Sequence, residues 1–287
     1  AGQLVTIDMQ RAAQMIDDLA PEAHETFLRV LDADTYKQYQ YLAVIIKPRT
    51  ESKSSVTLGN WMVERYVQLL CKYKPSGVAG FVEDLQVGDV RLEELLPSME
   101  DSGVVDAAVM LLAKQGQVQA AMDRLISHLG TRESGLVGIL RSVQESPDSA
   151  TTAEAIDDLV ASLDKYAKVG TWLCQGQTKT TNKSRAAGRS SRRGMAVLEQ
   201  PLSFDEVLWL DLIEAIVRIA SNVFAFMRDH YADKELTRIA QSTSHLGSTP
   251  THLVSSFRAL VQQVFTALLS STVKDGDTSA TDRTDVT

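Results

Sequence analysis

The segment Arg91–Gly130 constrains the fold of this 287-residue chain more than any other, because its apolar residues follow helical spacing and glycines interrupt it twice. Apolar residues recur every three or four positions between Gly103 and Gly116, and again from Val118 to Leu129. A glycine can take the left-handed backbone conformation that ends a helix. Because the connections are short, we expect three helices that pack as antiparallel neighbours.

Similar patterns occupy most of the remaining sequence, and strand patterns are scarce. We expect further helices at Thr6–Ala20, after Pro21, at Thr35–Lys47, at Thr57–Tyr73, after Pro75, and at Leu136–Val143, Ala153–Cys174, Phe204–Tyr231 and Pro250–Ser271. Pro48 is expected to stop one helix and Pro97 to bend or end another. The helix at 204–231 is apolar around much of its circumference, which predicts burial on several sides.

Helix pairs of this kind fit two architectures. In a compact bundle the Arg91–Gly130 hairpin is one pair among few, whereas in an α-solenoid similar pairs stack one after another. Local helix packing is the same in both, so periodicity alone leaves the choice open. Comparable helices on both sides favour the solenoid. We therefore predict an all-α fold, an α-solenoid of stacked antiparallel helix pairs.

Composition divides the chain into four parts. We expect a helical-repeat solenoid at 1–174, a flexible basic insertion at 175–200, a continuation of the solenoid at 201–272 and a disordered tail at 273–287. The insertion carries six cations and no acid before Glu199, namely Lys179, Lys183, Arg185, Arg189, Arg192 and Arg193. These six are the candidate residues for contact with a partner or a membrane. The alternative is a solvated loop without a partner.

No residue pattern points to catalysis or to a cofactor. The five histidines are His24, His128, His230, His245 and His252, none with a second ligand at metal spacing, and each is interpreted as a surface or helix-end residue. No phosphate-binding loop occurs, and paired carboxylates lie on polar helix faces. We expect no enzyme, no metal and no cofactor.

Charge and cysteine usage bound the environment. A net charge of −8 argues against general nucleic-acid binding, which needs a cationic face. The two cysteines, Cys71 and Cys174, lie in apolar contexts and are expected to be buried thiols in a reducing cytosol. The longest uninterrupted apolar run, Tyr41–Ile46, is too short to cross a bilayer. The chain starts without methionine, and we expect it to be a piece of a longer protein.

Three segments, 33–42, 73–129 and 208–220, resemble a known family. This family is the clathrin-heavy-chain-repeat region of the CORVET-specific sorting subunit, vacuolar protein sorting-associated protein eight. The family pattern is a helix ending in proline, an Arg-Leu helix, an Asp-Ala helix with paired leucines, a glycine turn and an alanine-rich helix. The matching residues are Tyr73–Pro75, Arg91–Leu92, Asp106–Ala107, Leu111–Leu112, Gly116 and Ala120–Ala121. The resemblance extends over residues 35 to 230.

The resemblance implies a cytoplasmic subunit of an endosomal tether, held peripherally on endosomal membranes. Its partners would be the other tethering-complex subunits, the class C core, and an early-endosomal Rab GTPase. The family's β-propeller and terminal zinc domain have no counterpart here, and two cysteines exclude that zinc domain.

Three functions remain open. The first is a scaffold that presents helix faces to partner subunits. The second is a module that contacts a GTPase or an anionic membrane through the basic insertion, since each cation near such a surface contributes about 1 kcal/mol. The third, RNA or DNA binding through the insertion, ranks lowest because no aromatic residues alternate with the cations.

Overall fold

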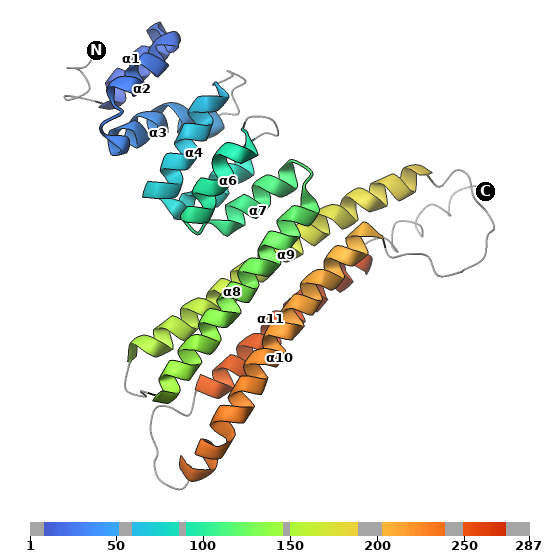
Figure 1. Ribbon diagram of the computed structural model, residues 1–287. Helices are drawn as coiled ribbons and strands as arrows, with labels where there is room; N and C mark the ends of the chain where they lie inside the picture. The colour runs from blue at the N-terminus through green and yellow to red at the C-terminus, as the bar shows by residue number, and fades with distance from the viewer. Residues whose placement is uncertain are drawn as a thin grey trace, which may run out of the picture. The chain divides into compact units, whose positions relative to one another are not determined.

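The computed structural model describes residues 9–51, 59–85, 90–145, 150–188, 203–238 and 249–273. Within these ranges the chain forms eleven α-helices and two short 3-10 helices without any strand, which confirms the predicted all-α class. The chain divides into two compact units, 1–121 and 122–287 (Figure 1). The predicted domain boundaries include no division at this position.

The first unit consists of short helices that stack in chain order. They are α1 (Met9–Leu19), α2 (His24–Val30), α3 (Thr35–Glu51), α4 (Asn60–Tyr73), α5 (Val78–Asp84), α6 (Leu92–Asp101) and α7 (Val105–Lys114), with 3-10 helices at Pro21–Ala23 and Pro75–Gly77. Helix α1 packs on α3, α3 on α4, α4 on α6 and α6 on α7. Because each helix packs on its near neighbours in the chain, this unit has the stepwise organisation of an α-solenoid.

The two glycine turns of the Arg91–Gly130 segment have the same geometry. Gly103 and Gly116 have φ angles of 70° and 81°, the left-handed conformation predicted from the sequence. After Gly103, the Val104 amide donates to the Met99 carbonyl at 2.9 Å, and after Gly116 the Gln117 amide donates to Leu112 at the same distance. This six-to-one bond is the Schellman motif, which satisfies carbonyls that a helix end leaves open.

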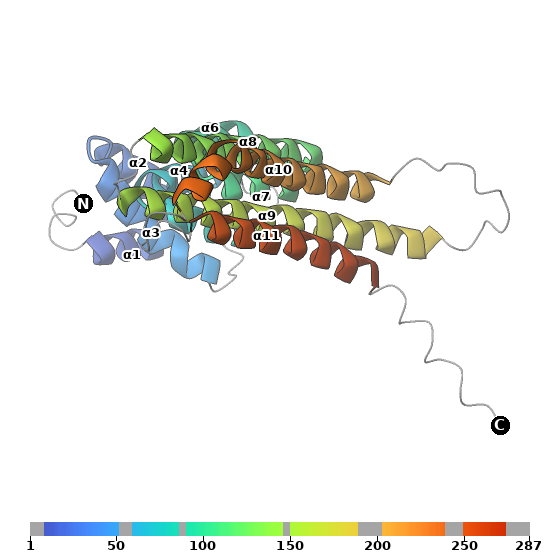
Figure 2. The same ribbon diagram turned by 90° about the horizontal axis from the view of Figure 1, so that it is seen from below.

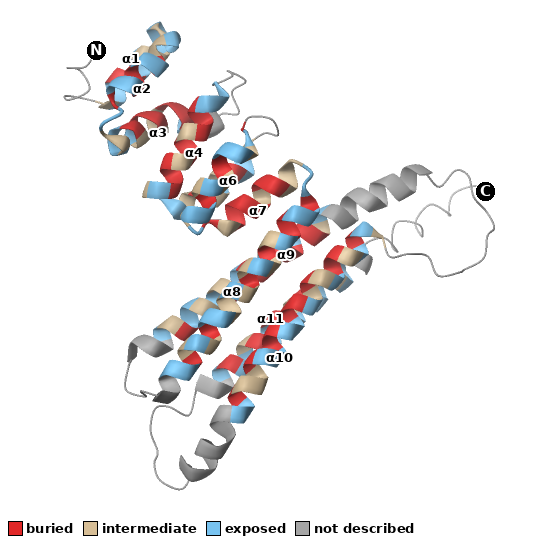
Figure 3. Cartoon of the chain, viewed as in Figure 1, coloured by how far each residue is buried: buried red, intermediate tan, exposed pale blue. Residues whose placement is uncertain are grey.

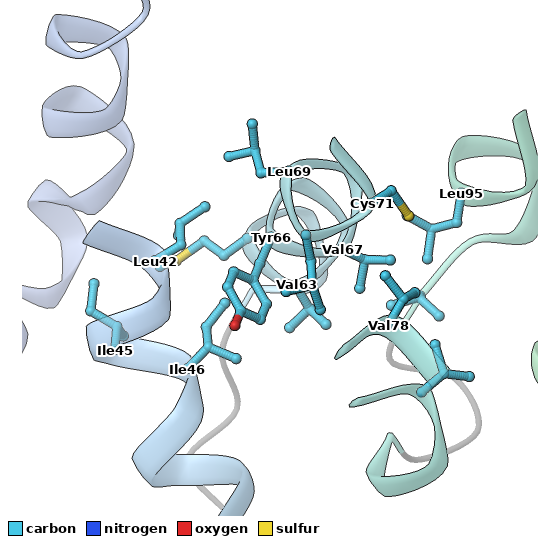
Figure 4. Packing of buried hydrophobic residues seen from close by; sticks show 14 of the residues in the cluster. Leu42, Ile45, Ile46, Val63, Tyr66, Val67, Leu69, Cys71, Val78 and Leu95 are labelled. Carbon is cyan, nitrogen blue, oxygen red and sulfur yellow. The ribbon is translucent and has the colours of Figure 1, made fainter. Parts of the chain in front are cut away.

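Apolar side chains from successive helices close the core of the first unit. Tyr66 of α4 lies between Leu42 and Ile46 of α3 on one side and Val78 of α5 on the other (Figure 4). Its ring packs edge-on to Phe81 with centroids 5.1 Å apart and stacks on Tyr39 at 6.0 Å. Burying each such large side chain stabilises the fold by about 1.5–3 kcal/mol, so α4 is the centre of this unit.

The second unit consists of long helices. It holds most of α8 (Val118–Glu145) together with α9 (Ala150–Gly188), α10 (Phe204–Arg238) and α11 (Thr249–Val273). Helix α9 packs on both α10 and α11, which also pack on each other. Helix α8 joins them through His128, whose ring lies 4.3 Å from that of Tyr166 on α9. Figure 2 shows α9 and α11 side by side along their lengths.

A glycine permits the closest approach of these helices. A Cβ added to Gly170 of α9 would lie 2.6 Å from a methyl carbon of Leu212 on α10 and 2.9 Å from one of Leu125 on α8. Both leucines are fully buried. Because Gly170 has no side chain, Leu125 of α8 and Leu212 of α10 pack directly against the backbone of α9 at this position.

Two helices of the second unit run further than predicted. Residues 118–145 form one helix, whereas the sequence predicted a break near Gly130 and a separate helix at 136–143. Leu129, Leu136 and Leu140 are buried along it, and their packing outweighs the cost of about 1 kcal/mol for each interior glycine. Helix α9 likewise continues past the predicted end at Cys174 to Gly188.

The predicted helix end at Pro48 is wrong, because α3 continues to Glu51. Pro97 lies inside α6 and so does not end that helix, while the alternative prediction of a bend there stays a prediction. Leu95 and Met99 on either side of Pro97 are fully buried, so packing holds the helix across the missing hydrogen bond.

The prediction that the helix at 204–231 is buried on several sides is wrong on one flank. Leu210 is 50% and Val217 is 42% exposed, although most other apolar residues of α10 are buried (Figure 3). The prediction for α11 holds, since its bounds lie within two residues of the predicted ones at each end.

By length and composition alone, α11 also passes the test for a membrane-spanning helix over His252–Ser271, of which 22% is buried in this structure. The sequence analysis predicted no span from its apolar runs. Leu253, Phe257, Leu260 and Val264 of α11 are buried among the other helices, so its apolar content also serves an ordinary helical core.

Candidate interaction surfaces

The six predicted contact residues divide between a helix and a segment outside the described residues. Lys179, Lys183 and Arg185 lie on the backbone of α9, while Arg189, Arg192 and Arg193 fall outside the described ranges. Part of the predicted insertion is therefore a helical extension that carries positive charge.

Cavity geometry gives a second candidate, a groove of about 410 Å³ between α9 and α11. Its walls include Val160 and Leu163 of α9 and Phe257 and Leu260 of α11, all apolar. At one end, the His252 ring nitrogen lies 3.6 Å from an Asp157 carboxylate oxygen. Such a groove can hold apolar side chains, and the sequence analysis did not identify it.

A third candidate is the set of large apolar side chains that remain exposed on α10 and α11. Of the exposed large apolar residues in the described part of the chain, half lie on these two helices: Phe204, Leu210 and Val217 on α10, and Val254, Phe265 and Leu269 on α11. Periodicity showed that these positions are apolar, but it could not separate burial in the chain from exposure to a partner.

Buried polar groups act inside the first unit rather than at these surfaces. The Glu64 carboxylate, 4% exposed, accepts hydrogen bonds from the Arg91 guanidinium at 2.8 and 3.1 Å and from the Arg91 backbone amide at 2.8 Å. Hydrogen bonding from the Arg91 side chain holds the pKa of Glu64 below its ordinary value. The pair fastens the start of α6 to α4.

Other polar side chains fasten helix ends in the same way. Gln38, also buried, donates to the Leu28 carbonyl at 3.0 Å and accepts from the Arg65 guanidinium at 2.8 Å. Lys114 donates to the Leu85 carbonyl at 2.8 Å. Each bond satisfies polar groups that a loop or helix end would otherwise leave open.

His24 lies at a helix end, one of the two predicted positions, but it is buried. It begins α2 but is 4% exposed, with one ring nitrogen 2.7 Å from the Tyr41 hydroxyl and the other 3.1 Å from the Asp17 carboxylate. Burial raises the pKa of Tyr41, which keeps its hydroxyl protonated. The three side chains therefore tie α1, α2 and α3 together.

The cysteines match their predicted state. Both Cys71 and Cys174 are free and buried, and burial raises the pKa of Cys174 to about 12. Such thiols remain protonated and unreactive at neutral pH. Among the described residues, no group of three or more His, Cys, Asp or Glu side chains could hold a metal ion.

Stacked antiparallel helices with apolar surface grooves define the class as a helical-repeat protein. Residues 152–287 match the sequence profile of the family described as VPS8-like, TPR-like repeats. The chain thus resembles the VPS8 family, as the sequence analysis predicted, and the match covers α9, α10 and α11. The match reaches past the predicted limit at residue 230, and it begins after two of the three segments that carried the resemblance, 33–42 and 73–129. No curated protein and no solved structure matches the chain.

Proposed function

We propose that this chain is a non-enzymatic scaffold segment of an endosomal membrane-tethering complex of the CORVET type. It acts in endosome fusion and in vacuolar or lysosomal protein transport by presenting helix faces to partner subunits. The observation that carries the proposal is the VPS8-like, TPR-like profile over 152–287. The stepwise helix packing and the exposed apolar residues of α10 and α11 support it.

The finer parts of the proposal concern partners and place. The partners are the class C core subunits of the tether and an early-endosomal Rab GTPase, and the repeats are of the clathrin-heavy-chain type. The chain works in the cytoplasm and reaches endosomal membranes peripherally, through the complex.

Membrane fractionation tests this function. Cells expressing the tagged chain are fractionated with and without the class C core. We expect the chain to sediment with endosomal membranes only when the core is present, and to be released by alkaline carbonate as a peripheral protein is. Sedimentation that is independent of the core, or an even distribution over all fractions, contradicts the proposal.

A second candidate function uses the cations on α9 and beyond. In it, Lys179, Lys183, Arg185, Arg189, Arg192 and Arg193 contact an anionic membrane or the Rab GTPase directly. The observation in its favour is that α9 carries the first three on a continuous helix that reaches Gly188.

Vesicles containing phosphatidylserine decide whether these cations bind a membrane. The variant with all six changed to glutamine should sediment less than the wild-type chain, and more salt should weaken the wild-type binding. The control variant changes Lys165 and Lys168, two exposed cations earlier on α9, to glutamine. Equal sedimentation of the wild-type and six-residue variant removes this candidate.

A further inference from the structure

Two apolar stripes on α10 and α11 face the same side of the second unit. On α10, Leu210, Val217 and Phe224 follow one another at seven-residue spacing and so lie along one stripe of the helix. The Phe224 ring packs edge-on to Phe257 of α11 with centroids 5.8 Å apart. The stripe that contains Leu210 and Val217 therefore runs along the side of α10 that faces α11.

On α11 the exposed apolar residues lie on the flank away from α9. His252, Ser256 and Leu260 line the groove with α9. Phe257 lies about 100° around the helix from Ser256. Val261 and Phe265 lie further around in the same direction, away from α9. Val254, Phe265 and Leu269 are 42%, 43% and 61% exposed. This flank therefore borders α10 on the outer side of the helix pair.

The antiparallel course of the two helices brings the stripes to the same level (Figure 1). With Phe224 beside Phe257, Val217 lies level with Val264 and Phe265, and Leu210 lies within about 5 Å of the level of Leu268 and Leu269. Leu210, Val217, Val254, Phe265 and Leu269 thus form one apolar surface, which we name the α10–α11 outer face.

We propose that the α10–α11 outer face binds an amphipathic α-helix of a partner protein, one that presents apolar residues and a carboxylate opposite Arg258. This inference deepens the proposed scaffold function, on which it rests. Arg258 is exposed and is the only Lys, Arg, Asp or Glu residue in α11. It lies four residues before Gln262 and seven before Phe265, on the same flank as Val254. A carboxylate on the incoming helix complements this one charge of α11.

The form of the surface favours a helix as its occupant. Its exposed positions on α11, from Val254 to Leu269, span sixteen residues, about 22 Å. Two neighbouring helices leave between them a groove that accepts the ridge of a third. Helical repeats bury their apolar faces by stacking further helices on them, and outer faces that stay in water are polar. The α10–α11 outer face is apolar and so has the composition of an inner face.

The surface suits a lipid bilayer less well. Helices that lie on membranes flank their apolar face with lysine and arginine. The other exposed residues of α11 include Ser255, Gln262, Thr266 and Ser270, which are uncharged. Its one arginine lies within the apolar flank rather than beside it.

A second copy of the chain also fits less well. An exposed carboxylate, Glu214, lies between Leu210 and Val217 on α10. Arg258 lies level with residue 223 and Glu214 level with residue 267, so the two charges are about 13 Å apart along neighbouring helices. In a two-fold dimer whose axis runs parallel to the helices, α11 of one copy packs on α10 of the other and the two charges keep this offset. In a two-fold dimer whose axis runs across the helices, α11 of one copy packs on α11 of the other. Neither arrangement places Glu214 opposite Arg258.

Fluorescence anisotropy with two labelled peptides tests the inference on the full chain. Each probe is a 21-residue helical peptide with leucine at the first and fourth positions of three heptads. The peptides differ at one residue beside the leucine stripe, which is glutamate in one and lysine in the other. We expect the glutamate peptide to bind about tenfold more tightly. Phe265→Asp should weaken its binding at least tenfold, and Arg258→Glu should reverse the preference.

Thr266→Asp is the matched control, because Thr266 is exposed on the same helix and the α10–α11 outer face excludes it. It should change the dissociation constant less than twofold, with helical content of all variants checked by circular dichroism. Several results overturn the inference: no binding of either peptide, equal affinity for both, or an equal loss in Thr266→Asp.

Two further measurements show whether a second copy of the chain or a lipid membrane binds this face instead of a partner helix. A dimer in light scattering that Phe265→Asp dissociates assigns this face to a second copy, and phosphatidylserine-vesicle binding that the same change abolishes assigns it to lipid. Either result overturns the inference. These results distinguish failure of the inference from failure of the proposed function. If the chain joins the class C core and Phe265→Asp does not weaken that binding, the proposed function stands and the inference about the α10–α11 outer face fails. If the chain binds the glutamate peptide selectively but does not bind the core, the inference stands and the proposed function fails.

Discussion

The two units of this chain both bury their apolar residues between packed helices, but their helices differ in length. In the first, helices α1–α7 run for 7 to 17 residues, and buried polar side chains such as Glu64 and Gln38 fasten their ends. In the second, helices run for 25 to 39 residues, and apolar ridges and a glycine notch at Gly170 hold them. Each helix end leaves four amides or four carbonyls open, so short helices need more internal polar contacts.

The two units differ in their polar contacts and in where their exposed apolar residues lie. Polar contacts within the first unit fix its helices to one another, whereas the long helices of the second unit have few ends to satisfy. Large apolar side chains are exposed in both units, among them Leu19 and Val30 in the first and Leu210 and Phe265 in the second. In the second unit most of them lie on two helices that pack on each other, α10 and α11.

The largest expected effect comes from truncating the centre of the first unit. Tyr66→Ala should lower the free energy of unfolding of that unit by about 3–5 kcal/mol, because Tyr66 is fully buried between α3 and α5. Hydrogen exchange measured peptide by peptide should show the loss in residues 1–121 alone. Tyr36→Ala, at a half-exposed tyrosine, is the control and should cost less than about 1 kcal/mol. An equal loss in the second unit would show that the two units unfold together.

Removing the Glu64 carboxylate comes next. Glu64→Ala should cost about 2–3 kcal/mol, since it removes charge-assisted hydrogen bonds that reach Arg91 from a buried position. Urea denaturation followed through the fluorescence of Trp61, three residues before Glu64 on α4, reports the change. Glu94→Ala is matched to it, because Glu94 also pairs with Arg91, at 3.5 Å, but is exposed. A similar cost in both variants would mean that burial of the pair is irrelevant.

In the second unit, two glycine-to-alanine substitutions should change the stability of the chain in opposite directions. Alanine favours helices over glycine by about 1 kcal/mol, so Gly138→Ala on α8, where an added Cβ meets nothing within 4 Å, should stabilise the chain by about 0.5–1 kcal/mol. Gly170→Ala should destabilise it by about 1–2 kcal/mol, because the new methyl group displaces Leu212 and Leu125. Thermal unfolding measures both. Stabilisation by both changes would contradict the close packing of Leu212 and Leu125 against Gly170.

The smallest effect is a pH dependence confined to the first unit. Because the pKa of Glu64 is lowered in the folded state, its contribution is fully present above the unfolded pKa and is lost as the pH falls through the folded value. From pH 6 downwards, through the ordinary value of 4.5, the wild-type first unit should lose more stability than its Glu64→Gln variant. Parallel pH curves for the two proteins would contradict the assignment.

The sequence predicts the parts of this fold that local chemistry determines. Gly103 and Gly116 end their helices as expected, since only a left-handed residue closes those turns without strain. The continuity of α8 and α9 was missed, because local rules place breaks at glycines that the buried leucines of α8 override.

The candidate surfaces were harder to predict than the fold. The charge run from Lys179 to Arg193 is visible in sequence, but its helical first part is not. The exposed flank of α10 was missed because apolar periodicity says which residues avoid water and not which molecule covers them. The buried position of His24 depends on Asp17 and Tyr41 from other helices, which no spacing rule connects.

The central claim is that this chain works by binding partner subunits through helix faces. Light scattering coupled to size-exclusion chromatography tests it most directly, on the purified chain mixed with purified class C core subunits. We predict a single peak whose mass is the sum of chain and core, lost in Phe265→Asp and kept in Thr266→Asp. Separate elution of chain and core at micromolar concentration would contradict it.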